Sequence, residues 1–333
     1  KEQNLDRALD AMEKEWSEID LEVMEYKETG TFVIKGTDDI FALLDDHIAK
    51  TQSMLGSPYI TNIRDKCESW LRKVTHIQLL LEEWLRVQRT WMYLQPIFSS
   101  DDIMRQMPAE GRRFGKVDRI YRQALADTAE NPRVLNLAKK EALLPNFRKA
   151  NAELDVTTKN LAEYLEVKRL AFPRFYFLSN DGLLEILSQT KDPRAAQKHL
   201  DKCFEGLNKI TFRGEAPKER GGTGNPEDLA IIEIKSHDGE TVPLIKFVDP
   251  NAPGNVGNVE VWLNQLLHAM RISVKDFVQR AIDAYPKTER TKWVLEHPAQ
   301  AVLNISQLYW TQEVETAFRR GGNKGLKDYV KKL

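Results

Sequence analysis

The sequence lacks most features that mark secreted, membrane-spanning or nucleic-acid-binding proteins. Only two of its 333 residues are cysteines, Cys67 and Cys203. Their wide separation excludes a disulfide framework or a structural zinc site and favours a reducing compartment. No apolar run reaches the ~20 residues of a membrane span, and the charged first residues do not resemble a signal peptide. The 49 Lys+Arg and 50 Asp+Glu residues give a net charge of -1, without the basic excess of a nucleic-acid binder. We therefore expect a soluble, intracellular protein with no membrane or nucleic-acid partner.

Catalytic motifs are also missing. The sequence contains no Gly-x-x-x-x-Gly-Lys-Ser/Thr phosphate loop, His-Glu-x-x-His, Cys-x-x-Cys, Gly-x-Ser-x-Gly or calcium loop, which are the spacings that common catalytic and metal sites require. Its six histidines are scattered without close pairs, and we expect His47 at or near the surface. We predict no catalytic residue, no cofactor and no metal. A mechanical or binding role is favoured, and an enzyme of unfamiliar type is a third alternative.

Apolar residues that alternate at steps of four and three predict long helices. The first would span about 28 residues, with the stripe Leu5, Leu9, Met12, Trp16, Ile19, Val23 and Tyr26. A short strand at residues 31–35 and a helix capped by Thr37 or Asp38 would follow. The longest helix is expected from residue 58 to about residue 94, and another carries the stripe Leu144, Phe147, Leu154, Leu161 and Leu165. Because each striped helix must bury its apolar face on a neighbour, the first ~170 residues predict a helical bundle.

Large aromatic residues lie at positions that we expect to pack in the core. Trp70, Trp84 and Trp91 share one face of the longest predicted helix, with Gln88 as its one polar break. Helical spacing favours core packing over a ligand site for these tryptophans. The run 171–178 contains a proline, so it predicts an extended segment or a tight elbow rather than a long helix. We expect its Phe175 and Phe177 to be core residues as well.

Loops interrupt the second half of the chain. A helix is expected at residues 181–189, another opens at Asp192-Pro193, and residues 210–212 read as extended. Residues 213–226 form a polar loop that we expect to be flexible. Its Gly-Gly-Thr-Gly run is similar to a phosphate loop, but no Gly-Lys-Ser/Thr follows. Asp-Gly between the runs 229–235 and 242–248 predicts a β-hairpin with Pro243 on its edge strand.

A connector follows the hairpin. Residues 249–258 are rich in Pro, Gly and Asn, and helices are expected beyond them at 259–272, 273–285 with Ser273 as the cap, up to 297, and 298–320. A mechanical element needs a local hinge between stiff pieces. The sequence offers two candidates, the aromatic elbow 172–178 and the loop, hairpin and connector of 213–258, and we favour the second because helix breaks, Gly and Pro concentrate there. The candidate hinge residues are Pro250, Pro253, Gly254 and Gly257. The chain would thus divide into residues 1–212, 213–258 and 259–333.

Four segments carry a resemblance to a known family. The longest is 174–193, RFYFLSNDGLLEILSQTKDP, which continues at 199–205 with HLDKCFE. Supporting segments are EWLRVQRTWMYL at 83–94 with PIF at 96–98, NVEVWL at 258–263, and QLYWTQEVE at 307–315. Together they resemble the linker region of dynein heavy chains, and LSND within the first segment resembles the axonemal type. Gly182, where the family commonly has an acidic residue, is a small departure.

The resemblance implies a mechanical function. It implies a mainly α fold, an elongated, curved rod of packed helical bundles with a small β-hairpin insertion. Such a linker swings over a ring of AAA+ modules in the same heavy chain and converts its ATP-driven changes into a power stroke. The ring would be its intramolecular partner, and microtubules would be reached only through a stalk outside this sequence. The expected location is the cytoskeleton of a cilium or flagellum, the axoneme. A non-motor helical scaffold or adaptor of spectrin-like type remains the alternative, because helical spacing alone is typical of both.

Overall fold

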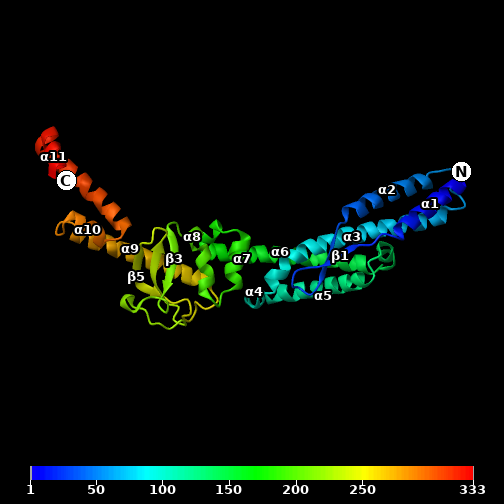
Figure 1. Cartoon of the computed structure of the whole chain (residues 1–333), viewed down its shortest axis with the longest axis horizontal. Coiled ribbons are helices and arrows are strands. Elements are labelled where there is room, and N and C mark those ends of the chain that lie inside the picture. The colour runs from blue at the N-terminus through cyan, green and yellow to red at the C-terminus, as the bar shows by residue number, and fades with distance from the viewer. Residues whose placement is uncertain (1, 333) are drawn as a thin grey trace. The chain divides into compact units, whose positions relative to one another are not determined.

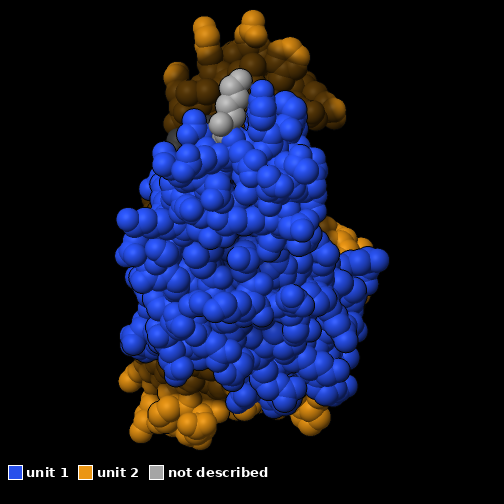
Figure 2. Space-filling model, turned by 90° about the vertical axis from the view of Figure 1, so that its right-hand side faces the viewer, with its two compact units in different colours: residues 1–164 blue, residues 165–333 orange. Residues whose placement is uncertain are grey.

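A computed structural model describes residues 2–332, and the chain divides into two compact units, residues 1–164 and 165–333. Figure 1 shows the path of the chain, and Figure 2 distinguishes the two units by colour. Helices dominate both units, and two small antiparallel sheets supply the strands. The predictions of a mainly α fold with helical bundling and a small hairpin are confirmed. The division at residues 212/213 and 258/259 stays a prediction.

Unit 1 is a helical bundle with a two-stranded sheet. Its helices are α1 (Glu2–Trp16), α2 (Asp38–Leu55), α3 (Arg64–Phe98), α4 (Asp101–Gln106), α5 (Pro108–Glu130), the 3-10 helix η1 (Val134–Lys139) and the first part of α6 (Leu143–Ala171). Its strands are β1 (Glu22–Glu25) and β2 (Phe32–Lys35), which pair antiparallel.

The prediction of a first helix of about 28 residues is wrong. Helix α1 ends at Trp16, and β1 occupies the stretch that the heptad pattern assigned to helix. The backbone there finds partners outside the helix, because the Leu21 N–H donates to the Pro132 carbonyl and Val134 donates to the Ile19 carbonyl. Leu21 is also buried, so the buried residues here alternate every two residues, as in a strand, and not every three and a half, as in a coiled-coil helix.

Helix α3 carries the buried stripe of unit 1. Trp70, Trp84 and Trp91 are at most 1% exposed, which is what a packing role requires. The helix begins at Arg64, six residues later than expected from Pro58, and it runs on through Pro96 to Phe98. A proline so close to the end is tolerated because it removes only one hydrogen bond from the last turns.

The one polar residue in this stripe has a structural partner. The side-chain amide of Gln88 accepts from the Ile34 N–H at 2.9 Å and donates to the Ile34 carbonyl at 2.8 Å. The Tyr121 hydroxyl reaches Gln88 Oε1 at 3.2 Å. Because a buried amide without partners would destabilise the fold, this pairing explains how α3 accepts a glutamine there, and it fixes β2 on the helix.

His47 is a buried residue, so the prediction of a surface position is wrong. It is 2% exposed, and its Nδ1 accepts a hydrogen bond of 2.9 Å from Trp16 Nε1. The sequence hides this contact because Trp16 lies 31 residues away on α1. The bond joins the last turn of α1 to the middle of α2.

Unit 2 contains a three-stranded sheet and several helices. The helices are the end of α6, η2 (Pro173–Phe177), α7 (Asn180–Ser188), η3 (Pro193–His199), α8 (Leu200–Cys203), η4 (Lys218–Arg220), α9 (Val259–Ala284), α10 (Arg290–Glu296) and α11 (Ala299–Lys332). The strands are β3 (Leu207–Phe212), β4 (Ile231–Ser236) and β5 (Thr241–Val248), in the order β3-β4-β5.

The predicted hairpin is present as β4 and β5, with Pro243 on the edge strand β5. The extended stretch 210–212 belongs to β3, which adds the third strand. Between the pairs Ile231↔Val248 and Glu233↔Pro243 the register shifts, which indicates a bulge in β5. Pro243, which has no N–H to donate, thus lies beside a bulge on an edge strand, where proline is tolerated.

Helix α9 is continuous where two helices were expected. Ser273, expected as a cap, lies inside the helix and is fully buried. Its hydroxyl donates to the Ala269 carbonyl at 2.7 Å and accepts from the Ile245 N–H at 2.9 Å. A serine that bonds to the fourth carbonyl before it is compatible with helix. The cap pattern therefore marks a contact with β5 rather than a helix start.

The aromatic elbow forms η2, and its two phenylalanines separate. Phe175 is fully buried and packs edge-to-face on Phe172, with ring centroids 5.0 Å apart. Phe177 is 70% exposed, so the prediction that it packs in the core is wrong. Two residues apart on a short 3-10 helix, the rings point to different sides, because three residues complete one turn.

The last helix is longer than expected. It was predicted to end at residue 320, but α11 continues to Lys332 across a kink at Gly321 and Gly322. Gly322 has a positive φ of 53°, which glycine adopts at little cost. Tyr329 beyond the kink donates to Glu313 Oε2 at 2.8 Å, which fixes the segment after the kink on the segment before it.

Protonation of His47 should destabilise unit 1. Trp16 can only donate, so His47 Nδ1 must be unprotonated, and burial lowers the pKa of His47 from its ordinary value of 6.5. With a folded-state pKa below the unfolded one, stability is complete above pH 6.5 and is lost as the pH falls below it. We expect the histidine's share of the free energy of unfolding to decrease by about 1–2 kcal/mol at low pH. Urea titrations of the wild type and His47→Gln at several pH values measure it. His237→Gln, at an exposed position, should keep the full pH dependence.

Trp91 and Phe177 should differ sharply in their contribution to stability. Trp91 is fully buried, stacks on Tyr121 with centroids 4.6 Å apart and donates to Asp118 at 2.8 Å. Trp91→Ala should lower the free energy of unfolding by about 3–5 kcal/mol, and the exposed Phe177→Ala by less than about 0.5 kcal/mol. Guanidinium unfolding of both variants provides the measurement, and equal losses would contradict the assignment.

Candidate functional site

The candidate hinge residues lie between the edge strand β5 and helix α9 of unit 2. Pro250 is buried, Pro253 and Gly254 are exposed, and Gly257 is half-buried. Gly254 and Gly257 have φ values of +89° and +78°, a region that other residues enter only with strain. The connector is therefore a series of turns whose shape depends on these two glycines.

One buried asparagine holds the connector in place. Asn255 is 4% exposed, and its amide donates to the Asp249 carbonyl at 2.7 Å and to Gln265 Oε1 at 2.9 Å. Gln265 Nε2 donates back to Asn255 Oδ1 at 3.0 Å. The reciprocal amide pair ties the connector to the second turn of α9, so in this conformation the connector is ordered by hydrogen bonds.

The start of α9 is also joined to the end of α6. Lys168 Nζ contacts Glu260 Oε1 at 2.6 Å, and both side chains are 11% exposed. Nearby, the Asn264 amide donates to the Ala171 carbonyl at 2.8 Å, which satisfies an orphan acceptor of the last turn of α6. The other carboxylate oxygen of Glu260 is buried and has no hydrogen-bond partner among the described residues. This α6–α9 joint thus combines a strong ion pair with an incompletely satisfied group.

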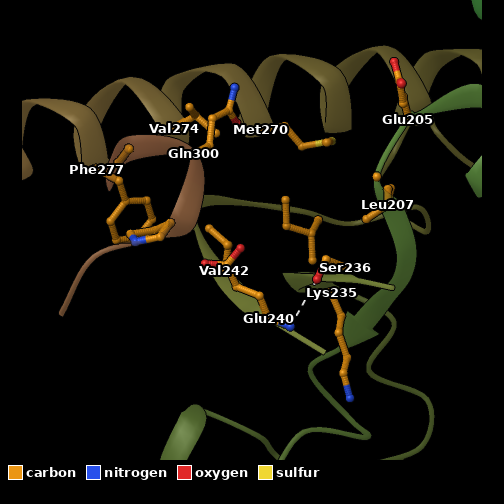
Figure 3. Close-up of a pocket in the computed structure, with 14 residues that line it drawn as sticks. Glu205, Leu207, Lys235, Ser236, Glu240, Val242, Met270, Val274, Phe277 and Gln300 are labelled. Atoms are coloured by element: carbon orange, nitrogen blue, oxygen red, sulfur yellow. Dashed lines mark hydrogen bonds between the residues drawn. The ribbon is translucent and has the colours of Figure 1, made fainter. Parts of the chain in front are cut away.

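A cavity of about 210 Å³ lies where β3, β4 and β5 meet α9 and the first turn of α11. Figure 3 shows Val242, Met270 and Val274 along its wall. Glu240, from the β4–β5 turn, accepts from the Ala299 N–H at 2.7 Å and so caps the N-terminus of α11. The cavity lining is mainly apolar and holds no cluster of catalytic groups.

The described part of the chain contains neither a metal-binding cluster nor a membrane-spanning helix. Within residues 2–332, no group of three or more His, Cys, Asp or Glu side chains is placed to hold a metal ion. The same residues include no helix that is long and apolar enough to cross a membrane. The arrangement consists of joints between stiff elements.

The family of the chain follows from its sequence as a whole. The family described as "Dynein heavy chain, N-terminal region 2" matches residues 1–281, which include the connector and the start of α9. The chain belongs to the dynein heavy chain family. The resemblance seen in the sequence is thereby confirmed.

The curated relatives of this dynein chain are of the axonemal type. "Dynein axonemal heavy chain 1" of Mus musculus is 46% identical over 321 residues, which cover 96% of this chain and 7% of the relative. "Dynein axonemal heavy chain 12" of Rattus norvegicus is 43% identical and "Dynein axonemal heavy chain 3" of Homo sapiens 42% identical, each over 333 residues, and the chain covers 10% and 8% of them. The chain thus spans a tenth or less of the length of these relatives.

Sequence reasoning found the connector but missed the residues that hold it. Glu260 lies inside the family-like segment 258–263, which could have drawn attention to it. Lys168 sits among other charged residues near the end of α6 and carries no signal of its own, since its partner is 92 residues away. Asn255 was counted as a turn former, although its amide is a buried structural group.

Removing one charge of the α6–α9 joint should lower the free energy of unfolding more than removing both charges does. Glu260→Leu leaves the buried Lys168 ammonium without its carboxylate, and we expect a loss of about 3–5 kcal/mol in the free energy of unfolding. The double variant Lys168→Met/Glu260→Leu replaces the pair by apolar groups of similar volume and should recover most of that loss. A double-mutant cycle by urea unfolding measures the coupling. Purely additive effects of the two single variants would contradict it.

Proposed function

We propose that this chain is the linker of an axonemal dynein heavy chain, a mechanical lever whose swing converts ATP-driven changes elsewhere in the heavy chain into a power stroke. The observation that carries the proposal is the identity of 42–46% to axonemal heavy chains over nearly the whole sequence. The mainly α composition supports it, because packed helices with continuous buried stripes resist bending. The proposed location is the axoneme of a cilium or flagellum.

The proposed partner is the AAA+ ring of the same heavy chain. Microtubules would be contacted through a stalk outside this sequence, so we assign neither ATP hydrolysis nor microtubule binding to residues 1–333. The missing phosphate-loop motif supports that assignment, since ATPases of this kind cradle the phosphates with such a loop.

We place the bend at residues 249–258. Two positive-φ glycines allow the backbone a change of direction that other residues would resist. The hydrogen bonds of Asn255 can be exchanged for contacts with water at modest cost, because the net energy of a hydrogen bond between neutral groups is about 1 kcal/mol. An apolar interface of the same size would resist opening more strongly.

Strain in the connector should slow movement more than it slows ATP turnover. Gly254→Ala/Gly257→Ala forces two residues with a Cβ into positive φ, at a cost of about 1 kcal/mol each. In a whole heavy chain that carries the double change, we expect the velocity of microtubule gliding to decrease by about two- to five-fold, while ATP turnover changes much less. The assays are surface gliding and phosphate release on the same preparation.

Gly239→Ala is the matched control. Gly239 also has a positive φ, +91°, but it lies in the β4–β5 turn outside the connector. It should leave gliding and turnover coupled as in the wild type. An equal loss of velocity and turnover in the connector variant would argue against a hinge there.

A further inference from the structure

The loop between β3 and β4 is closed at its base by an ion pair. Arg213 Nε donates to Asp228 Oδ2 at 2.7 Å, and the backbone N–H of Gly214 donates to the Asp228 carbonyl at 2.8 Å. The Arg213 guanidinium lowers the pKa of Asp228 below its ordinary value. This pair, together with the strands, determines where the loop starts and ends.

Thr223 stands at this ion pair. Its hydroxyl donates to Asp228 Oδ2 at 3.0 Å, the same oxygen that receives Arg213, and its backbone N–H donates to the Arg213 carbonyl at 3.0 Å. The side chain is exposed, and from Pro217 to Glu227 no side chain is buried. Opening this part of the loop therefore removes no apolar packing, and it breaks a few hydrogen bonds and the ion pair between Arg220 and the buried Glu233.

The residues before Thr223 form a recognition pattern for protein kinases. Lys218-Glu-Arg220-Gly-Gly-Thr223 places an arginine three residues before the hydroxyl, and kinases select such substrates by charge pattern. The Arg220 guanidinium is 49% exposed and contacts Glu233 at 3.2 Å. Glycines at 221, 222 and 224 leave the segment free to become extended.

The sequence has one other Arg-x-x-Ser/Thr segment, and the fold protects it. Arg72 and Thr75 have the same spacing but lie inside α3, and Thr75 stands between the fully buried Val74 and Ile77. This segment cannot become extended unless α3 unfolds. The two threonines share the sequence pattern and differ in their exposure, so exposure determines which of them a kinase can reach.

We propose that Thr223 is a phosphorylation site for an arginine-directed serine/threonine protein kinase, and that the phosphate takes Arg213 from Asp228. In the transfer, a bond forms between Thr223 Oγ1 and the γ-phosphorus of ATP. The bond to the β–γ bridging oxygen breaks, ADP leaves, and the hydroxyl proton passes to the carboxylate base of the kinase. The product carries a charge of about -1.5 to -2.

The phosphate charge changes which acidic group Arg213 pairs with. The phosphate repels the Asp228 carboxylate, now its neighbour, and offers Arg213 a more strongly charged, bidentate partner. Loss of the Arg213–Asp228 pair frees the start of β4, which Asp228 holds through its contacts with Gly214 and Ala230. The inference uses only this loop and stands whether or not the chain acts as a lever.

Labelling of the folded chain tests the site. The 333-residue chain is incubated with Mg²⁺-ATP and the catalytic subunit of the cyclic-AMP-dependent protein kinase, an arginine-directed enzyme, and phosphopeptides are mapped by mass spectrometry. We expect close to one phosphate per chain at Thr223, none in Thr223→Ala, and a rate lowered about ten- to hundred-fold in Arg220→Ala. Thr75 should be labelled only in urea-unfolded chain or in a synthetic peptide of residues 70–78.

Two labelling results would overturn the proposal. Labelling of Thr75 in the folded chain at a rate like that of Thr223 would overturn the role of exposure. Failure to label Thr223 in the folded chain would overturn the site, whether or not a peptide of residues 214–228 is accepted.

The transfer of Arg213 from Asp228 to the phosphate can be measured separately. A ³¹P NMR titration of the phosphorylated chain reports the second pKa of the phosphothreonine, ordinarily about 6. If Arg213 binds the phosphate, this pKa lies below the ordinary value and rises again in Arg213→Gln. A value that Arg213→Gln leaves unchanged, or one raised above about 6 by the Asp228 carboxylate, would overturn the exchange of partners.

Discussion

Unit 1 depends on one constraint: helix α3 must bury one face from solvent along its 35 residues. Every neighbour is placed by this requirement: α2 lies along it, Phe147 of α6 packs against Trp84 with centroids 5.0 Å apart, and Tyr121 of α5 stacks on Trp91. Aromatic rings contribute large buried areas at low entropic cost. The single glutamine in the stripe is accepted because both polar ends of its amide find the backbone of β2. The indole N–H groups of Trp70 and Trp84 have no hydrogen-bond partner among the described residues, so burial of apolar area contributes more to this face than polar pairing does.

Unit 2 also has a buried apolar core, and directional polar contacts join its elements around the connector. The Ser273 hydroxyl receives the Ile245 N–H of the bulged edge strand, and the amides of Asn255 and Gln265 pair reciprocally. Such contacts determine register but release little free energy, unlike the aromatic stripe of α3. Glu260, with one buried oxygen left without a partner in the described residues, is an example of a joint that is not fully optimised.

The sequence predicted elements well and contacts poorly, for a physical reason. Periodicity reports which face of a segment is buried, so α2, α3, α6 and the β4–β5 hairpin were identified from it. It does not report what the face is buried against. The heptad stripe continued past Trp16 into β1 because Ile19, Leu21 and Val23 also alternate at the period of a strand. His47 and Ser273 were misplaced because their partners, Trp16 and Ile245, lie 31 and 28 residues away. Phe177 was misplaced because hydrophobic residues also occur on surfaces.

The same reasoning applies to the candidate site. Gly254 and Gly257 were recognisable since glycine in a turn-rich segment signals a backbone need that the residue itself reveals. Lys168 and Glu260 were not, because an ion pair depends on a distance of 2.6 Å between residues 92 apart in sequence, which no local pattern encodes. The family is likewise identified by similarity spread over nearly all of the residues and not by reactive groups at a fixed spacing, because a catalytic motif reports a local site whereas similarity of this extent reports the whole fold.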